Sequence, residues 1–221
     1  MINTKVKICG LSRTEDIHAV NECLPDFIGF VFAPSPRQIS LAQAAILRAE
    51  LDTRIKAVGV FVDASIEDIV SAFEMGVIDM VQLHGNEDSY YIEELKSAKL
   101  IPVIKALKLN PQGTLLQEVP PNADYLLFDA QSPGCGTRFA WDEQTISALR
   151  RLRRSFMLAG GINLENLEEV LALNPWGIDV SSGVESCGKK NRGLIRKLVF
   201  RVQRKDSPAR PGESEDTKEQ L

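Results

Sequence analysis

Residues 156–185 constrain the fold more strongly than any other stretch of this chain. They contain two short strand-like runs, FMLA at 156–159 and IDV at 178–180, and each run is followed by small residues. Between the runs, leucine and valine recur at the spacing of one helix face. Two strands joined by a helix form a βαβ unit, whose strands are parallel. This stretch therefore predicts a parallel sheet with crossover helices.

The turns that follow these two runs are suited to a phosphate group. The first turn carries Gly160 and Gly161, and the second carries Ser181, Ser182 and Gly183. Such turns expose backbone N–H groups, which bind phosphate together with a helix N-terminus. Either turn alone is explained as well by a tight connection. Two such turns at consecutive strand exits favour phosphate, because phosphate sites recur at the last two loops of (β/α)8 barrels.

The strand–helix alternation continues along almost the whole chain. Eight apolar runs alternate with helical patterns, and they cover residues 5–9, 26–32, 55–62, 79–83, 101–109, 125–130, 156–159 and 178–180. The connection at 111–121 is rich in turn residues, so any helix there is short. Capping boxes are expected at Ser12 and Ser40.

This alternation predicts an α/β fold, a single-domain (β/α)8 TIM barrel over residues 1–203. An open doubly wound sheet is the competing topology. Such a sheet usually carries a nucleotide fingerprint at its first strand–helix turn, and CGLS at 9–12 is not one. Residues 204–221 show no apolar periodicity and are expected to form a polar, disordered tail without a catalytic role.

Composition excludes several classes of partner. The 221 residues are 44% hydrophobic and carry a net charge of −4, which suits one globular domain and argues against a nucleic-acid partner. No apolar run approaches the roughly 18 residues that span a membrane. The N-terminus shows no signal peptide, and the four cysteines match no CxxC or zinc spacing. We therefore expect a cytoplasmic protein with free thiols.

Reactive side chains at the strand exits are the candidates for chemistry, because the active site of a barrel lies at the carboxyl ends of its strands. Cys9 and Asp129 would stand on opposite sides of one mouth and could pass a proton between them. Cys9 would need a lowered pKa to act as a base, and Asp129 a raised pKa to act as an acid. Equally, Cys9 fits a small buried hydrophobe and Asp129 fits a turn aspartate.

Other polar residues at the exits leave alternatives open. Arg37 is either a partner for a substrate carboxylate or a surface arginine. His84 is a base, a phosphate neighbour or a residue that closes a turn. Lys105 is a Schiff-base lysine or the ion-pair partner of Asp129 or Asp79. No cluster of residues has metal-ligand spacing, so no metal is predicted.

Together, these residues resemble one known family. The motifs KICGLSRTEDI, GFVFAPSPRQIS, VGVFVDAS, VQLHGNED, LLFDA, LAGGINLENL and GIDVSSGVE look like successive motifs of the phosphoribosylanthranilate isomerase family. They occur in the family's order over about residues 5–202. Their joint occurrence is far more specific than any single motif.

The resemblance implies a fold, a reaction and a set of residue roles. It implies a (β/α)8 barrel without a cofactor that converts N-(5'-phosphoribosyl)anthranilate into 1-(2-carboxyphenylamino)-1-deoxyribulose 5-phosphate, an Amadori rearrangement of tryptophan biosynthesis. By resemblance, Cys9 is the general base, Asp129 is the general acid, and Arg37 meets the anthranilate carboxylate. The phosphate would be held by Gly160, Gly161, Ser181, Ser182 and Gly183.

The chain departs from the family pattern in two loops. Ala140 stands where the family has aspartate, Cys187 where it often has proline, and Asn191 where it has aspartate. The changes at Cys187 and Asn191 are expected to loosen the loop beside the phosphate, although Asn191 can still cap a helix.

Two other functions stay open. The first is a related phosphate-binding barrel that acts on another ribosyl aminoaldose or as a sugar-phosphate epimerase, although an epimerase would normally need metal ligands. The second is a barrel that binds a phosphorylated ligand or a protein without turnover, against which the presence of both Cys9 and Asp129 argues. In each case the expected partner is a small phosphorylated molecule, and the chain is a monomer or a homodimer.

Overall fold

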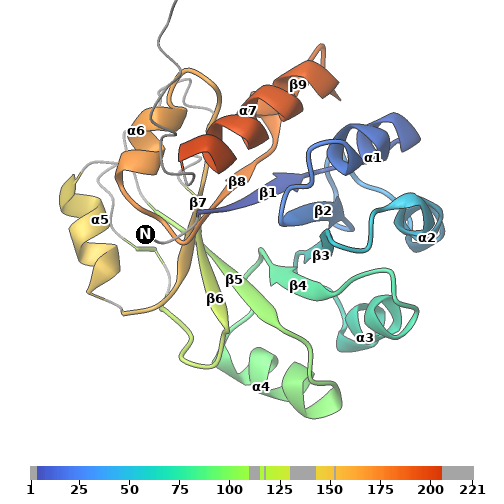
Figure 1. Ribbon diagram of the computed structural model, residues 1–221. Coiled ribbons are helices and arrows are strands. Elements are labelled where there is room, and N and C mark those ends of the chain that lie inside the picture. The colour runs from blue at the N-terminus through green and yellow to red at the C-terminus, as the bar shows by residue number, and fades with distance from the viewer. Residues whose placement is uncertain (1–3, 110–114, 117, 130–142, 152, 206–221) are drawn as a thin grey trace, which may run out of the picture.

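The computed structural model describes residues 4–109, 115–116, 118–129, 143–151 and 153–205. Its centre is a closed barrel of eight strands in sequence order (Figure 1). The strands are β1 (Lys5–Cys9), β2 (Phe27–Val31), β3 (Lys56–Phe61), β4 (Met80–Leu83), β5 (Val103–Lys108), β6 (Tyr125–Asp129), β7 (Phe156–Ala159) and β8 (Gly177–Val180). All neighbouring strands are parallel, and β1 pairs with β8. The predicted (β/α)8 barrel is therefore confirmed, and the open sheet is excluded.

Helices surround this barrel (Figure 1). They are α1 (Thr14–Asn21), α2 (Leu41–Glu50), α3 (Ile66–Glu74), α4 (Ser89–Ala98), α5 (Glu143–Arg150), α6 (Leu167–Ala172) and α7 (Arg192–Lys205). The described residues between β5 and β6 contain no helix, and residues 110–114 and 117 lie outside the description. A short 3-10 helix, η1 (Ser182–Val184), and the strands β9 (Glu185–Ser186) and β10 (Lys189–Lys190) join β8 to α7. Residues 206–221, most of the predicted tail, are not described.

Side chains at the helix starts agree only partly with the predicted capping boxes. Ser40 Oγ accepts a hydrogen bond from the Gln43 backbone, as expected, but the Gln43 side chain donates to the Ser12 carbonyl oxygen instead of closing the box. The box predicted at Ser12 is wrong. Arg13 is the N-cap of α1, and the Asp16 carboxylate accepts from the backbone N–H groups of Ser12 and Arg13. Asp16 is already positioned inside the first helical turn, where a carboxylate is favourable.

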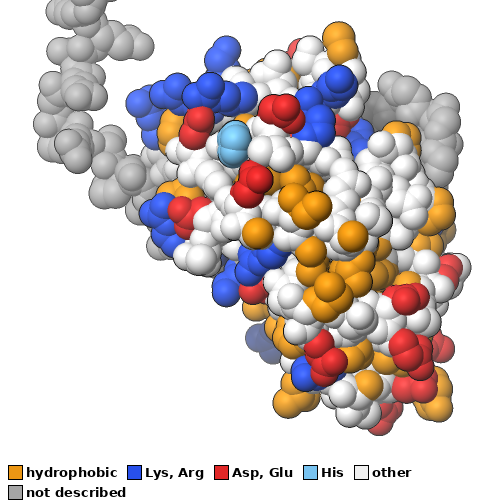
Figure 2. Space-filling view, turned by 90° about the vertical axis from the view of Figure 1, so that its right-hand side faces the viewer, with side chains coloured by type: hydrophobic (Ala, Val, Ile, Leu, Met, Phe, Trp, Pro, Cys, Tyr) orange, Lys and Arg blue, Asp and Glu red, His pale blue; other side chains and the backbone are white. Residues whose placement is uncertain are grey.

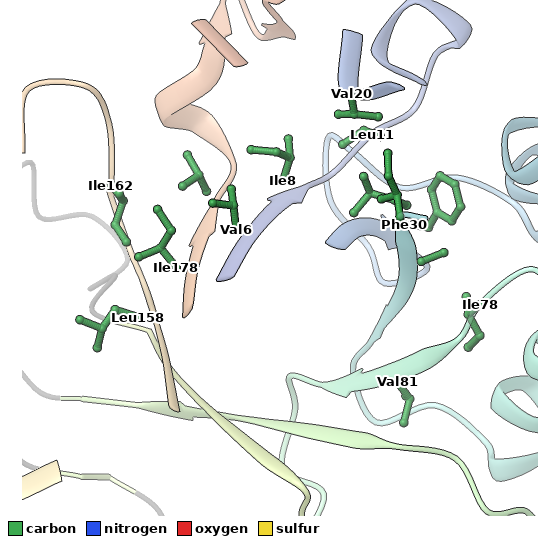
Figure 3. Packing of buried hydrophobic residues seen from close by; sticks show 14 of the residues in the cluster. Val6, Ile8, Leu11, Val20, Phe30, Ile78, Val81, Leu158, Ile162 and Ile178 are labelled. Atoms are coloured by element: carbon green, nitrogen blue, oxygen red, sulfur yellow. The ribbon is translucent and has the colours of Figure 1, made fainter. Parts of the chain in front are cut away.

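Alternate side chains of each strand point to opposite sides of the barrel wall and belong to two different parts of the core. Outward-facing side chains pack against the helices: Val6 of β1 lies beside Ile178 of β8, and Ile8, Leu11 and Val20 gather toward α1 (Figure 3). Inward-facing side chains form a second cluster inside the barrel, made of Val58, Met80, Ile104, Ala106, Leu127, Met157 and Ala159. Both faces of a barrel strand are buried, so the strands read as continuous apolar runs.

Aromatic rings close the amino-terminal end of the barrel. Trp176, just before β8, stacks on Tyr125 at 4.6 Å between ring centroids and lies 6.0 Å from Phe27. These rings pack against the inner cluster. A pocket that reaches the barrel axis therefore opens at the opposite end, where the strands finish.

The outer surface over α1, α2 and α3 carries no single sign of charge. Figure 2 shows this face, on which apolar side chains gather near the middle and charges of both signs flank them. The exposed apolar residues Ile46 and Met75 belong to α2 and to the end of α3. Within the described part of the chain, no helix has both the length and the apolar character needed to cross a membrane.

Candidate active site

A cavity of about 290 Å³ opens at the carboxyl ends of the barrel strands. It brings together seven of the eight site residues predicted from the sequence, namely Cys9, Arg37, Asp129, Gly160, Gly161, Ser181 and Ser182. The eighth, Gly183, is packed behind the cavity wall: a Cβ added to it would lie 1.8 Å from the Ile162 carbonyl oxygen. Gly183 therefore allows the loops after β7 and β8 to touch.

Cys9 ends β1 and is almost wholly buried, with 8% of its surface exposed. Its carbonyl oxygen accepts a hydrogen bond from Ser181 Oγ at 3.0 Å. Burial raises the pKa of the Cys9 thiol; Lys7 and Lys190 lower it and Asp179 raises it, and the net pKa is raised. This direction is opposite to the lowered pKa that a general base would need.

Lys7 lies beneath Cys9 on the same face of β1, two residues earlier, and none of its surface is exposed. Its Nζ is 3.0 Å from Asp179 Oδ2, and the two residues are partners in the β1–β8 register. The second carboxylate oxygen, Asp179 Oδ1, has no hydrogen-bond partner within the described chain. Asp179 also lines the cavity, so this buried acceptor faces the space that a ligand would fill.

Sequence reasoning did not single out Lys7. The signal was a lysine two residues before Cys9 in an otherwise apolar run, because alternate residues of a strand share one face. A buried ammonium needs a partner, which Asp179 supplies from 172 residues away in the sequence.

Asp129 ends β6 and lies near His84, which follows β4, the next strand but one in the barrel. His84 Nε2 is 3.4 Å from Asp129 Oδ2, and His84 Nδ1 is 2.8 Å from Gln82 Nε2. Gln82 is buried, and its Oε1 has no partner among the described residues. Of the three roles considered for His84, turn closure is not what its side chain does, because the ring joins Gln82 to Asp129.

Lys105 does not take the role or the partners predicted for it. Its neighbours Ile104 and Ala106 belong to the inner cluster, so Lys105 faces out of the barrel and does not line the cavity. Its Nζ is 2.7 Å from Glu87 Oε2 and 2.8 Å from the Gly85 carbonyl oxygen. Both a Schiff-base role and ion pairs with Asp129 or Asp79 are therefore wrong.

Arg37 is held at the rim by a carboxylate from the other end of the chain. Its Nε and Nη2 each lie 2.7 Å from an oxygen of Glu185, and Glu185 Oε1 is also 2.6 Å from Lys190 Nζ. The hydrogen bonds from Arg37, with those from Lys190, hold the pKa of Glu185 at about 2. Arg37 Nη1 takes no part in this bidentate pair, so that donor is available to a ligand.

The hairpin that carries Glu185 explains one departure from the family pattern. Cys187 and Gly188 link β9 to β10 with φ angles of 51° and 73°. Two consecutive positive φ angles make the two-residue turn that suits a hairpin. Proline cannot adopt such a φ, so the proline of the family pattern is incompatible with this turn. Asn191 caps α7 as expected, accepting from the Leu194 backbone at 3.1 Å. Ala140 lies outside the described residues.

The described residues hold no group of three His, Cys, Asp or Glu side chains that could bind a metal ion. Cys9, Cys23 and Cys187 are free thiols, and Cys135 lies outside the description. The chemistry of the cavity is thus available from a thiol, a carboxylate paired with an imidazole, a buried ammonium and a rim guanidinium.

One family of known proteins matches the sequence over nearly its whole length. The sequence model described as "N-(5'phosphoribosyl)anthranilate (PRA) isomerase" matches residues 6–201. The N-(5'-phosphoribosyl)anthranilate isomerase of Clostridium kluyveri is 41% identical over 200 residues, which cover 90% of this chain and 98% of the relative.

Solved structures agree with this match. The phosphoribosyl anthranilate isomerase of Thermus thermophilus superposes with a TM-score of 0.76 at 35% identity and covers 91% of this chain and 99% of its own. Another phosphoribosyl anthranilate isomerase, with a TM-score of 0.75 and 30% identity over 90% of this chain and 98% of its own, was solved in complex with reduced 1-(o-carboxyphenylamino)-1-deoxyribulose 5-phosphate.

Proposed function

This chain belongs to the N-(5'-phosphoribosyl)anthranilate isomerase family, and from this premise we propose that Cys9 and Asp129 carry the family's reaction in the cavity at the barrel mouth. The chain is an isomerase of tryptophan biosynthesis that acts on N-(5'-phosphoribosyl)anthranilate. The proposed reaction is an Amadori rearrangement to 1-(2-carboxyphenylamino)-1-deoxyribulose 5-phosphate. The observation that carries the residue roles is that Cys9 of β1 and Asp129 of β6 line one cavity from different sides of the barrel.

The proposed sequence begins at Asp129. Its protonated carboxyl gives a proton to the furanose ring oxygen, the bond from that oxygen to C1 breaks, and the nitrogen lone pair forms an iminium with C1. The Cys9 thiolate then takes the proton from C2, and the C2–H electrons form a double bond to C1 and leave a neutral enolamine. Return of a proton to C1 and loss of the hydroxyl proton at C2 give the ketone. No covalent enzyme intermediate and no redox step is needed.

Two features of the structure support these roles. His84 lies beside Asp129 at the mouth, and Gln82 in turn holds His84, so the carboxyl has a neighbour that helps to orient it. Cys9 is shielded from bulk water and has a buried ammonium beside it, and this ammonium favours the thiolate. Proton transfer at a carbon next to an iminium suits this pair of groups.

The remaining wall of the cavity suits a phosphate at one end and a carboxylate at the other. Gly160 and Gly161 have φ angles of 94° and 67°, which turn the backbone after β7 along the cavity. We place the phosphate between this turn and Ser181–Ser182, with Gly183 allowing the two loops to touch. Arg37 Nη1 then meets the anthranilate carboxylate while Glu185 keeps the guanidinium oriented.

A fluorescence assay tests this function directly, because the substrate loses the fluorescence of its anthranilate adduct as it isomerises. Purified protein should convert N-(5'-phosphoribosyl)anthranilate and leave other phosphoribosyl amines of a small panel unchanged. Faster turnover of another amine would favour the related aminoaldose isomerase, and tight binding with no loss of signal would favour the binding barrel.

Two expectations from the sequence stay predictions. The cytoplasmic location is one of them. The other is the oligomeric state, either monomer or homodimer; a solved Thermotoga maritima relative that is 30% identical is described as monomers generated from a dimeric enzyme.

A further inference from the structure

We propose that Lys7 is a positioning residue: held in place by Asp179, it supplies the positive charge against which Cys9 gives up its proton. This inference rests on the proposed role of Cys9 as the base. It assigns a purpose to the buried Lys7–Asp179 ion pair, which the substrate-binding roles leave unused.

The first step of the argument is the geometry of β1. Lys7 and Cys9 point to the same side of the strand, and the space between them is left by Gly29, the register partner of Cys9. A Cβ added to Gly29 would lie 2.6 Å from Cys9 Sγ and 3.2 Å from Lys7 Nζ. Both atoms therefore border the same small space, where the charge of the ammonium favours the thiolate.

The second step is the surroundings of this pair. Below Lys7 the barrel interior is apolar, and none of the Lys7 surface is exposed. Charges interact strongly where water is excluded, so an ammonium at this position weighs far more on the thiol than one at the surface would. A buried lysine is also costly to keep charged, and a purely structural role would be served as well by an apolar side chain.

The third step is the part played by Asp179. Burial lowers the pKa of Lys7, but the contributions of Asp179 and of Cys9 exceed that effect, and the net pKa is raised. Lys7 thus carries its charge throughout the working pH range. Asp179 also disfavours the thiolate, although less than Lys7 favours it.

Other charged groups face Cys9 from the elements around it. Lys190 of β10 favours the thiolate, and Arg37 of the loop after β2 interacts with the same thiol. Across the cavity stand Asp129 and His84. Lys7 is the largest of the favourable influences on the thiolate. Its removal should therefore move the ionisation of Cys9 more than removal of any other group.

Site-resolved alkylation tests this inference without relying on turnover. The intact protein is treated with iodoacetamide across a pH series, and the alkylated fraction of the Cys9 peptide is measured by mass spectrometry, with exposed Cys187 as an internal reference. In Lys7→Met the midpoint for Cys9 should move to higher pH by at least about one unit, and the acidic limb of kcat/KM should move with it. Lys5→Met is the matched control, because Lys5 lies on the same face of the same strand but pairs with Asp26 near the surface.

A second variant is needed in case Lys7→Met does not fold, because that variant leaves the buried Asp179 carboxylate without its partner. Lys7→Met/Asp179→Asn removes both charges, so neither charge is left buried without its partner. Its Cys9 midpoint should lie above that of the wild type and below that of Lys7→Met. A midpoint at or below the wild-type value in the double variant overturns the inference, as does an unchanged midpoint in a folded Lys7→Met.

The two proposals fail separately. If Cys9→Ala is inactive but the alkylation midpoint of Cys9 is unchanged in Lys7→Met, then Cys9 is the base and the role inferred for Lys7 is wrong. If the midpoint moves but kcat/KM does not follow it, Lys7 acts on the thiol as inferred and Cys9 is not the base.

Discussion

His84 Nε2 lies 3.4 Å from Asp129 Oδ2, and the other ring nitrogen of His84 is 2.8 Å from Gln82 Nε2. Gln82 Nε2 thus faces one ring nitrogen of His84, and the other ring nitrogen faces the Asp129 carboxyl. The acid of the proposed mechanism is therefore the end of a chain of three side chains, each supported by the one before it.

Removing the acid should stop the reaction at ring opening. Asp129→Asn keeps the shape and the contact with His84 but has no proton to give, and we expect kcat to fall by about 10²–10⁴-fold. Steady-state fluorescence kinetics measure this. His84→Asn is the companion variant; it keeps the carboxyl but removes the imidazole beside it, and kcat should fall by about tenfold while KM changes little. Turnover of Asp129→Asn near the wild-type rate would end the assignment of Asp129 as acid.

Removing the base should stop the reaction after the ring has opened. Cys9→Ala leaves a slightly smaller side chain at a site where 8% of the surface is exposed, so the fold is retained and kcat falls by about 10²–10⁴-fold. Thermal unfolding provides the control, since the midpoint should change by only a few degrees. Cys23→Ala is the matched comparison; Cys23 is a buried thiol that bonds to helix carbonyls and does not line the cavity. Equal losses in both variants would point to stability instead of chemistry.

Local sequence patterns predict where the strands of this fold end. They do not predict the direction in which each polar side chain points. Lys105 shows why. Its strand is apolar on both faces, with Ile104 and Ala106 inside and Val103 and Leu107 outside, so alternation gives no sign of which face a lysine takes. The ion-pair partners predicted for Lys105 were wrong as well. An outward-facing Lys105 reaches Glu87, which belongs to the loop after β4.

Pairs between distant segments could not be found from the sequence at all. Arg37 and Glu185 are separated by 148 residues, and Lys7 and Asp179 by 172. Each member is a common residue type in an ordinary context, and only closure of the barrel through β1 and β8 brings the partners together. The shared location of Cys9 and Asp129 could be predicted, because both residues end apolar strands and all strands of the barrel end at the same rim.

The ion pair at the rim predicts a pH dependence of stability. Arg37 and Lys190 depress the pKa of Glu185 from 4.5 to about 2, so the unfolded state binds a proton at Glu185 before the folded state does. The stabilisation is complete above about pH 4.5 and is lost as pH falls toward 2. Urea unfolding of wild type and Glu185→Gln measures it as a difference that is largest at pH 7 and shrinks between pH 4.5 and pH 2. A difference that stays constant over this range contradicts the shifted pKa.

The same pair predicts an effect on substrate binding. Without Glu185, the Arg37 guanidinium loses the bidentate contact that fixes its plane, so Glu185→Gln should raise KM by about tenfold. Arg37→Lys should raise it further, because an ammonium cannot make a planar contact with a carboxylate. Kinetics with a substrate analogue that lacks the anthranilate carboxylate supply the control. If the KM of that analogue rises as much as the KM of the substrate in both variants, Arg37 does not bind the anthranilate carboxylate.

Contact between the loops after β7 and β8 gives the last prediction. A Cβ on Gly183 would stand 1.8 Å from the Ile162 carbonyl oxygen, which is backbone and cannot move aside as a flexible side chain could. Gly183→Ala should therefore push the Ser181–Ser182 turn away from Gly160–Gly161, raise KM by at least about tenfold, and weaken inhibition by inorganic phosphate in parallel. Gly188→Ala is the matched control: with a φ of 73° it strains the backbone, but nothing lies within 4 Å of the added Cβ. Inhibition by phosphate that is unchanged in a folded Gly183→Ala would mean that the phosphate does not lie between these two turns.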